Sequence, residues 1–509
     1  MDAIDKHREI NERRARLFKG GGAEEIDKQH RRGKLTARER IEKLLDKGSF
    51  SEVDLWSTPL ETGFDIDRQS VQGDGVVAGY GNINGQAVCI WSQDYTVLEG
   101  RAGIIHTQKI TRLLEKALNA RVPFIGIIDS EGLKVEDMLS APTVCSYDRL
   151  AYLQTVSSGV IPQISLVMGP CRGMAALSAM LSDFVFMVKN TSNMHVTPFF
   201  EGVDENEQGA AWMHAKNSGC CDVIAENDED CLKQCRELLG FLPPNNKGPI
   251  RKHATDDIPD RKEEELLTIV PVDQSKTYNM KKLIALLVDN GDFLEIKRHW
   301  AANLIVGFAR LDGQSVGIVA NNPQNRGGCM DMNAADKMAR FVRFCDAFHI
   351  PLIWLIDTPA FLPAVEEERG GIIRHGAKVV SANSLATVPQ MSVYIRKCYG
   401  GGNLAMPGEN LGGDMTFAWP TAIVSPMIPD GAVAILYRKE IQAAENPAEL
   451  QKKRVKEFEK STGGILWKCI PVQEFIDPRE TRFVLIKALQ RLSDKNEETI
   501  WRRHDNIPL

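Results

Sequence analysis

Residues Ala386 to Asp414 read A-T-V-P-Q-M-S-V-Y-I-R-K-C-Y-G-G-G-N-L-A-M-P-G-E-N-L-G-G-D. The first half of this stretch is an apolar run typical of a buried strand, and three consecutive glycines end that run abruptly. Glycine at such a break lets bare backbone N–H groups face a ligand. The stretch therefore predicts a buried strand followed by a binding loop.

A similar sequence pattern occurs once more in the chain, at Val160–Ala175, as V-I-P-Q-I-S-L-V-M-G-P-C-R-G-M-A. Three residues of each stretch pair at a constant offset of 227, namely Pro162, Gln163 and Cys171 with Pro389, Gln390 and Cys398. Further pairs lie at an offset of 228, among them Gly79, Gly85, Lys109 and Asp129 with Gly307, Gly313, Lys337 and Asp357. This spacing is far larger than that of a solenoid repeat. It indicates two homologous domains, head to tail.

Composition limits the possible partners of the chain. The 509 residues are 43% hydrophobic, enough for two or three domains that each bury a core. Lys and Arg number 62 against 68 Asp and Glu, for a net charge of −6. A global basic field that would favour nucleic acid is therefore excluded, and any anionic ligand must be bound by a local site.

Apolar strands alternate with helices in both halves, which predicts an α/β fold whose strands are covered on both faces. A polar, proline-rich stretch at Leu242–Glu265 is typical of a linker. We therefore expect two tandem α/β domains related by internal duplication, residues 1–250 and residues 251–509. Within the first, Thr36 with Glu39 three residues later predicts a helix N-terminus.

The N-terminal segment is helical in pattern and strongly charged, without the apolar core of a signal peptide. With no apolar run of about 18 residues elsewhere, we expect a cytoplasmic protein. Eleven cysteines with no CxxC pair favour reduced thiols and no metal site. The basic run Lys28, Arg31, Arg32 and Lys34 could meet a polyphosphate or form a solvated helix face, which is what most charge runs do.

No nucleophile or metal motif stands out in the sequence. An isolated histidine such as His375 is more often a structural hydrogen-bonding residue than a base. The two glycine loops are the stronger signal, because backbone donors at a strand-to-helix break suit a developing enolate or oxyanion. Two such loops indicate two anions.

Several long stretches resemble one family, the carboxyltransferase subunits of biotin-dependent acyl-CoA carboxylases, such as propionyl-CoA carboxylase beta subunits, and of the related methylmalonyl-CoA or glutaconyl-CoA decarboxylase alpha subunits. They are G-D-G-V-V-A-G-Y-G, S-Q-D-Y-T, S-G-V-I-P-Q-I-S-L-V-M-G-P-C, A-R-F-V-R-F-C-D-A-F, G-G-I-I-R-H-G-A-K, Y-G-G-G and D-P-R-E-T-R. The resemblance extends from Lys28 to Leu489.

The resemblance implies two crotonase-like domains and a homo-hexamer, with acyl-CoA on the N-terminal domain and biotin on the C-terminal domain. It implies that carboxybiotin loses CO2 to leave a ureido anion, which takes the α-proton of the thioester before the enolate attacks CO2. Biotin must arrive on a separate carrier protein, because the chain has no A-M-K-M motif. The further partner is a biotin carboxylase or a membrane decarboxylase pump subunit.

Position by position, the resemblance implies that the N–H groups of Gly173 and Met174 form the thioester oxyanion hole and those of Gly401 and Gly402 the biotin hole. The chain departs from the family around the substrate. G-P-C-R-G-M-A stands where the family has G-P-C-A-G-G-A, which introduces Arg172 and Met174. The donor at Met174 is retained only if φ is negative there.

Two more departures concern substrate binding. Lys134 stands where the family has an arginine near the CoA, which keeps the charge and loses the bidentate fork. Leu404 replaces an aspartate that helps to shape the acyl pocket. Arg172 must meet water, a carboxylate such as Glu131 or Glu201, or a second carboxylate on the acyl chain.

Three functions remain open at this level. The first is a biotin-dependent carboxyltransferase on an acyl-CoA, in the carboxylating or decarboxylating direction. The second is a biotin-free enolate enzyme on the same fold, favoured by the altered first loop. The third is a non-catalytic partner subunit.

Overall fold

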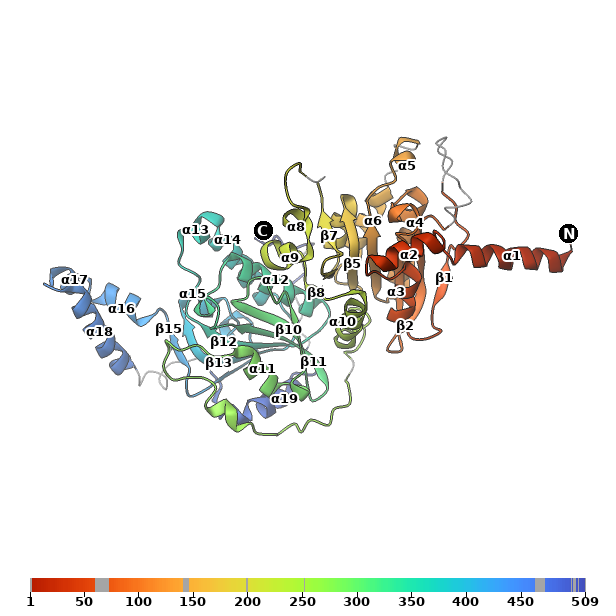
Figure 1. The fold of residues 1–509 in the computed structure, drawn as a ribbon. Coiled ribbons are helices and arrows are strands. Elements are labelled where there is room, and N and C mark those ends of the chain that lie inside the picture. The colour runs from red at the N-terminus through yellow and green to blue at the C-terminus, as the bar shows by residue number, and fades with distance from the viewer. Residues whose placement is uncertain are drawn as a thin grey trace. The chain divides into compact units, whose positions relative to one another are not determined.

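The computed structural model forms two compact units, Met1–Pro249 and Ile250–Leu509, which are described separately (Figure 1). The structure describes residues 2–59, 73–140, 146–197, 200–250, 252–462, 472–495, 497, 500–501 and 503–508. Among these residues, no helix is long and apolar enough to cross a membrane.

The helices and strands of the first unit follow one another as a strand-rich α/β domain. They are α1 (Ala3–Leu17), α2 (Ala23–Arg31), α3 (Ala37–Leu44), β1 (Ser51–Val53), β2 (Val76–Ile83), β3 (Gln86–Gln93), η1 (Leu98–Gly100), α4 (Ile104–Ala120), β4 (Phe124–Ser130), α5 (Val135–Ser140), α6 (Ser146–Ser157), β5 (Gln163–Arg172), α7 (Met174–Met180), β6 (Phe184–Val188), β7 (Asn193–His195), α8 (Glu205–Gly209), α9 (Ala211–Met213), the π-helix η2 (His214–Ser218), β8 (Val223–Ala225) and α10 (Asp228–Phe241).

The elements of the second unit repeat much of this order. They are η3 (Glu264–Leu267), α11 (Met280–Leu287), η4 (Asp289–Gly291), β9 (Phe293–Ile296), β10 (Leu304–Leu311), β11 (Gln314–Asn321), η5 (Arg326–Gly328), α12 (Met332–Ala347), β12 (Leu352–Thr358), α13 (Val365–Gly370), α14 (Ile372–Ser384), β13 (Gln390–Tyr399), α15 (Gly400–Leu404), η6 (Glu409–Leu411), β14 (Met415–Ala418), β15 (Ile423–Ser425), α16 (Pro429–Leu436), α17 (Arg438–Ala443), α18 (Pro447–Thr462), β16 (Glu474–Phe475), η8 (Pro478–Glu480) and α19 (Thr481–Arg491).

The two sheets have the same topology. The first has the order β1-β2-β3-β4-β5-β6-β8, with β7 beside β5, and the second has the order β16-β14-β13-β12-β11-β10-β9, with β15 beside β13. In each sheet the first three strands along the chain are antiparallel and the remaining strands are parallel. The register of the two central parallel strands shifts at the same place in both sheets. The shift precedes the pair Ser130–Cys171 between β4 and β5 and the pair Thr358–Cys398 between β12 and β13. The predicted duplicated α/β fold is confirmed.

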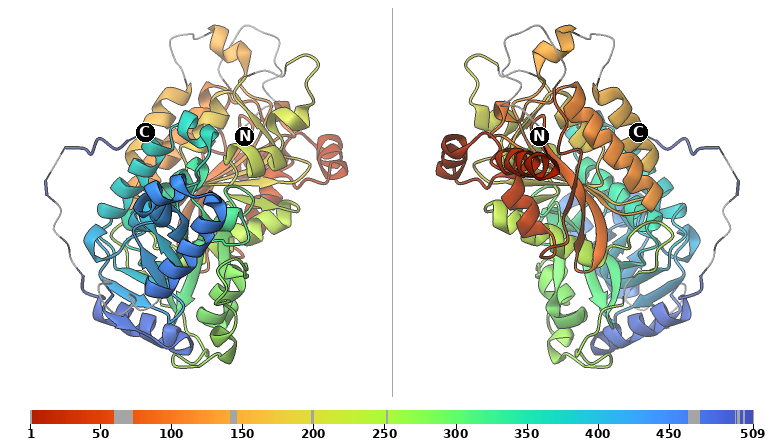
Figure 2. Two further views of the ribbon diagram at one scale, coloured as in Figure 1. Left: turned by 90° about the vertical axis from the view of Figure 1, so that its left-hand side faces the viewer. Right: turned by 90° about the vertical axis from the view of Figure 1, so that its right-hand side faces the viewer.

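Helices cover both faces of the second sheet (Figure 1). Alternate residues of β10 point to opposite faces, so Ile305 and Ala309 pack with Leu283 of α11 and Leu485 of α19. Phe308 packs on the other side against Phe341 of α12, at a ring-centroid distance of 5.1 Å. The first unit buries a similar core between its sheet and helices such as α4 and α6, which run side by side (Figure 2).

Matching caps begin the helix that leads into each sheet. The Thr36 side chain accepts a hydrogen bond from the Glu39 N–H, and the Glu39 carboxylate accepts one from the Thr36 N–H, so the predicted capping box is present. In the second unit, Asn279 caps α11 through the Lys282 N–H. The two units thus repeat the lead-in helix as well as the sheet.

Candidate functional site

The second glycine break lies where β13 ends and α15 begins. Gly400 has a φ of +52°, a conformation that disfavours other residues. Gly401 and Gly402 follow in the first turn of the helix, where backbone N–H groups have no intrahelical acceptor. The break therefore presents donors at the carboxyl end of a central strand, as the sequence predicts.

The structure requires glycine at position 402 for packing but not at position 401. A Cβ on Gly402 would lie 2.9 Å from the Ala360 carbonyl carbon, so that glycine is needed for packing. A Cβ on Gly401 would meet only the ring of Phe361, at an ordinary contact distance of 3.5 Å, and the φ of Gly401 is not positive. Glycine there costs about 1 kcal/mol relative to alanine in a helix, and the described chain gives no steric reason for it. A ligand that approaches the backbone closely is such a reason.

A further donor beside this break was missed by the sequence reasoning. Phe361 forms a parallel bridge with Met330, in which the Leu362 N–H donates to the Met330 carbonyl at 2.8 Å. The Phe361 N–H itself has no hydrogen-bond partner in the described part of the chain. Because the peptide that precedes Phe361 packs against Gly402, this donor lies next to the glycine break.

The first glycine break has the same backbone. Gly173 has a φ of +62° and matches Gly400 at the offset of 227, so Met174 matches Gly401. The Gly173 N–H donates to the His195 carbonyl at 2.9 Å and is therefore occupied within the unit. Met174 does not have a positive φ, and its N–H opens α7. Of the predicted pair, Met174 keeps a free donor among the described residues.

Leu133 occupies the position of Phe361 in the first unit, at the offset of 228. It bridges to Ala102, and the neighbouring Lys134 N–H donates to the Ala102 carbonyl at 3.0 Å. The Leu133 N–H has no partner within the described ranges. The residue type at this position does not indicate a donor. In the sequence, only the internal repeat relates Leu133 to Phe361.

Arg172 lies next to the first break and pairs with a protein carboxylate. Its Nη1 atom is 2.5 Å from Oε2 of Glu131, and the Tyr95 hydroxyl donates to Oε1 of Glu131 at 3.1 Å. Burial and the Glu131 charge raise the pKa of Tyr95 to about 12. Of the alternatives for Arg172, the structure shows the salt bridge to Glu131.

Lys134 requires a correction. Its ammonium is completely buried, with Nζ 2.9 Å from Oδ1 of Asp74 and 3.4 Å from Oδ2 of Asp137. An ammonium enclosed by two carboxylates cannot reach a ligand at the surface, so Lys134 stabilises the interior of the unit. Asp74 lies in the quoted stretch G-D-G-V-V-A-G-Y-G and Asp137 follows Lys134 by three residues, but the sequence does not show that both carboxylates enclose this ammonium.

Leu404 and His375 lie near the second break. Leu404 ends α15 with its side chain 63% exposed, so it is available to a ligand or to another chain. His375 bonds through Nδ1 to Oδ1 of Asp336 at 2.8 Å, and the Lys378 ammonium contacts the same oxygen at 2.7 Å. This cluster joins α14 to α12, which fits a structural histidine.

No group of side chains suited to a metal occurs among the described residues.

Comparison with known proteins agrees with this geometry. The carboxyl transferase domain model matches residues 28–507. The chain is 43% identical to the propionyl-CoA carboxylase beta chain of Roseobacter denitrificans, over 98% of this chain and 99% of that protein. It is 42% identical to the methylmalonyl-CoA decarboxylase subunit alpha of Veillonella parvula, over 98% of each.

Among solved structures, the transcarboxylase 12S hexamer with methylmalonyl-coenzyme A bound is 38% identical and superposes with a TM-score of 0.93, covering 100% of this chain and 99% of that one. A duplicated α/β fold with a glycine break in each copy thus defines a carboxyltransferase. The chain belongs to the carboxyl transferase family, and the predicted membership is confirmed.

Proposed function

We propose that this protein is the carboxyltransferase subunit of a biotin-dependent enzyme and moves a carboxyl group between carboxybiotin and an acyl-CoA. The observation that supports this most directly is the pair of matching glycine breaks at the carboxyl ends of central strands, each with backbone donors that have no partner among the described residues. The names of the relatives add the substrate class, since both are enzymes of acyl-CoA carboxylation or decarboxylation.

The first unit is proposed to hold the thioester. Its oxygen would accept hydrogen bonds from the Met174 N–H and from the neighbouring donor of Leu133, with the Gly173 N–H supporting the turn through His195. Fixed donors of this kind stabilise negative charge as it develops, and loss of one typically slows turnover by about 10²- to 10³-fold. Arg172 with Glu131 holds the adjoining strand end in place.

The second unit is proposed to hold the biotin. Gly401 and Gly402 would donate to the ureido oxygen, with the Phe361 N–H as a third donor, and the bare surface of Gly401 lets the ring approach. When bound, carboxybiotin supplies the carboxyl group and the base for the α-proton of the thioester. This chain's own part is to bind, to orient and to stabilise charge, and His375 need not act as a base.

Two further parts of the proposal concern assembly. Biotin comes on a carrier protein, with a biotin carboxylase or a membrane pump subunit as the remaining partner. The chain forms a homo-hexamer in which the first break of one subunit meets the second break of another. The hexamer of the 38% identical transcarboxylase 12S supports this.

Avidin tests the proposal. The purified complex should contain a biotinylated chain, and avidin should abolish decarboxylation of methylmalonyl-CoA or ATP-dependent carboxylation of propionyl-CoA. Reproducible turnover that avidin does not affect would instead support a biotin-free enolate enzyme. Light scattering should give the mass of six subunits, and the mass of one subunit at micromolar concentration would contradict the shared site.

A further inference from the structure

Three neighbouring strands of the first unit end in side chains that contact one another. Tyr95 follows β3 by two residues, Glu131 directly follows β4, and Arg172 ends β5. The Arg172 Nη1 atom lies 2.5 Å from Oε2 of Glu131, and the Tyr95 hydroxyl donates to Oε1 of Glu131 at 3.1 Å. Because these strands are parallel neighbours, the Tyr95–Glu131–Arg172 network joins three carboxyl ends at one edge of the sheet.

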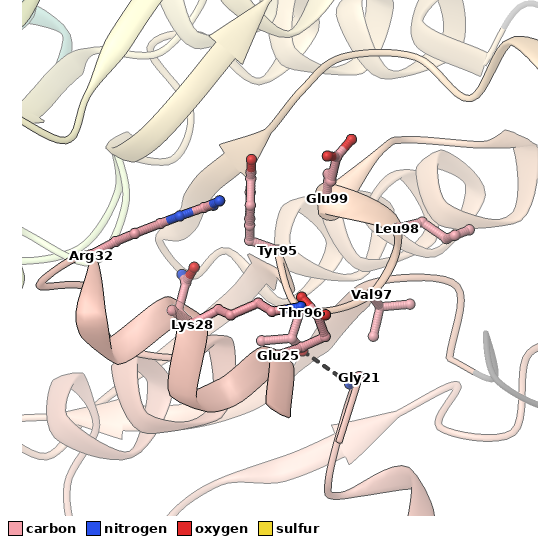
Figure 3. A pocket seen from close by; sticks show the side chains of 10 residues that line it. Gly21, Glu25, Lys28, Arg32, Tyr95, Thr96, Val97, Leu98 and Glu99 are labelled. Carbon is pink, nitrogen blue, oxygen red and sulfur yellow. Dashed lines mark hydrogen bonds and ion pairs between the residues drawn. The ribbon is translucent and has the colours of Figure 1, made fainter. Parts of the chain in front are cut away.

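Tyr95 is itself held by cations from the N-terminal segment. Its ring lines a cavity beside α2, and Arg32 reaches toward it from the end of that helix (Figure 3). The Arg32 guanidinium lies 5.2 Å from the ring centroid and the Lys34 ammonium 4.4 Å, which stabilises the ring by cation–π attraction. Since burial and the Glu131 charge raise the pKa of Tyr95 to about 12, its hydroxyl stays protonated near neutral pH and donates to Glu131.

The network lies next to both backbone donors of the first glycine break. Leu133 follows Glu131 by two residues, and Met174 follows Arg172 by two residues. A Cβ on Gly132 would lie 3.7 Å from Cβ of Arg172, so the two segments are also in van der Waals contact. The ion pair therefore links the segment that carries one donor N–H to the segment that carries the other.

The second unit restrains the matching strand ends in another way. At offsets of 228 and 227, the three positions are occupied by Pro323, Pro359 and Tyr399. Proline restricts its own φ and forms no ion pair. The Tyr399 hydroxyl donates to Oε1 of Gln274, which precedes α11, at 2.8 Å. A network of charged and polar side chains across these strand ends is thus a feature of the first unit alone.

We propose that Glu131 and Arg172 are positioning residues for carboxyl transfer. Their ion pair fixes the distance between the Leu133 and Met174 N–H groups, which would share the thioester oxygen, and Tyr95 supports the pair. The inference rests on the proposed function and deepens it by naming what holds the donors. Such donors stabilise a developing oxyanion only when they are held within about 0.5 Å of their working positions. The pair also leaves neither of its charges alone beside that anion.

Steady-state kinetics of the purified complex with an acyl-CoA is the first test. Arg172→Met should lower kcat about tenfold or more and change KM by less than about threefold, because the donors act on charge that develops after binding. Arg172→Lys keeps a charged donor for Glu131 and should lose less. The double variant Glu131→Gln/Arg172→Met should recover part of the loss, because it leaves no unpaired carboxylate beside the oxyanion.

Hydrogen exchange of the full chain, followed by mass spectrometry, separates positioning from folding. The Lys134 N–H donates to the Ala102 carbonyl at 3.0 Å, and the Gly173 N–H donates to the His195 carbonyl at 2.9 Å. These two amides adjoin the donors. Peptides that contain them should exchange faster in Arg172→Met, while the rest of the first unit should not change.

Arg149→Met is the matched control. Arg149 pairs with Glu115 at 3.0 Å between α6 and α4 of the same unit, and its side chain is 58% exposed. The variant removes an ion pair of the same unit that takes no part in the Tyr95–Glu131–Arg172 network. Its kcat and its exchange should equal those of the unaltered chain.

An unchanged kcat in Arg172→Met would overturn the inference, and so would a rise in KM alone, because Arg172 would then bind the substrate. Unchanged exchange of the two peptides would overturn it as well. Faster exchange throughout the first unit would show that the pair only stabilises the fold. If the unaltered complex transfers no carboxyl group, the proposed function fails, and the exchange of the two peptides still decides whether the pair holds the donor segments.

Discussion

Two buried aspartates, Asp129 at the end of β4 and Asp357 at the end of β12, occupy the same position in the two units and are neutralised in different ways. Both are completely buried. Asp129 pairs with Lys34 at 2.6 Å and with Arg40 at 2.8 Å, both from the N-terminal helical segment. Asp357 pairs with Arg396 of the neighbouring strand β13, at 3.0 Å.

Neighbouring residues in each unit explain why the two aspartates have different cationic partners. The position of Arg396 in the first unit is Gly169, and a Cβ there would lie 1.9 Å from Oδ1 of Asp129. The position of Arg40, four residues after the helix cap, is Leu283 in the second unit, where it is buried in an apolar core. Each aspartate therefore receives its cations from one direction, Asp129 from the N-terminal helical segment and Asp357 from the neighbouring strand.

The buried aspartate is common to both units, whereas the cation that neutralises it comes from a different segment in each. A buried carboxylate without a partner costs several kcal/mol, so each copy must provide a cation. In the first unit that requirement ties residues before Leu45 to the sheet, because Arg40 also bonds Asp228 at 2.8 Å. The N-terminal segment is thus part of the core of the first unit.

The largest effect is expected for Arg396→Met. Arg396 is the one cation that pairs with Asp357 among the described residues, so its removal leaves a buried charge, at a cost of about 3 to 5 kcal/mol in the free energy of unfolding. Urea-induced unfolding followed by the fluorescence of buried Trp354 measures it. The exposed Lys452→Met serves as control. A loss below about 1 kcal/mol would mean that Asp357 does not depend on this cation.

The two glycines at the second break should separate stability from activity. Gly401→Ala should leave stability unchanged or raise it by up to about 1 kcal/mol, while carboxyl transfer slows by about 10²-fold, because the new methyl group holds the ligand away from the donors. Gly402→Ala should cost about 1 to 3 kcal/mol of stability, since its Cβ would press on Ala360.

The two units differ at this position, because the residue that matches Gly402 in the first unit is Ala175, and a side chain is accommodated there. Turnover and urea unfolding are measured on the same preparations. Full activity in Gly401→Ala would show that no ligand approaches this backbone.

Lys34→Met should have a smaller effect than Arg396→Met. Asp129 keeps Arg40 at 2.8 Å and the Gln29 amide at 3.0 Å, so the loss is one charge-assisted hydrogen bond, about 1 to 3 kcal/mol. The same urea experiment measures it, with Lys43→Met on the exposed face of α3 as control. A loss as large as that of Arg396→Met would mean that the two cations around Asp129 act as one unit.

The sequence was sufficient for the fold because its signals are local or periodic. The fixed offset revealed the duplication, the apolar runs gave the central strands, and Thr36 with Glu39 marked a helix start. These features depend on residues close together in the chain or on exact repetition, and the structure has them where the pattern placed them.

The sequence was less informative about the site because partners there come from distant segments. The Gly173 N–H is occupied by the His195 carbonyl, and Lys134 is paired with Asp74, 60 residues away in the chain. The N–H groups of Leu133 and Phe361, which have no partner in the described part of the chain, follow the ends of two strands, and no residue type marks them in the sequence. Arg172 is intermediate: its salt bridge was one of the stated alternatives, and only the structure selects Glu131.

The smallest effect concerns Lys109 and Lys337, another matched pair. Both ammonium groups are buried and donate to backbone carbonyls, Lys109 to Gly73 and Val76 and Lys337 to four carbonyls that include Leu304 at 2.7 Å. Burial lowers the pKa of Lys109 to about 8 and the pKa of Lys337 to about 7. The pKa of lysine in an unfolded chain is about 10.4.

Between these pKa values the unfolded chain binds a proton that the folded chain does not, so the free energy of unfolding rises with pH. From pH 7 to pH 8 the rise should be about 1 kcal/mol from Lys337 and about 0.4 kcal/mol from Lys109. Urea unfolding at the two pH values measures it as the difference between each lysine variant and the unaltered chain, because burial raises the pKa of several thiols and their opposing contribution is common to all of them. Lys337→Met should abolish the larger part of the rise and Lys109→Met the smaller part. Equal slopes in both variants and in the unaltered chain would mean that the backbone carbonyls keep both lysines charged, and that in this respect the two units do not differ.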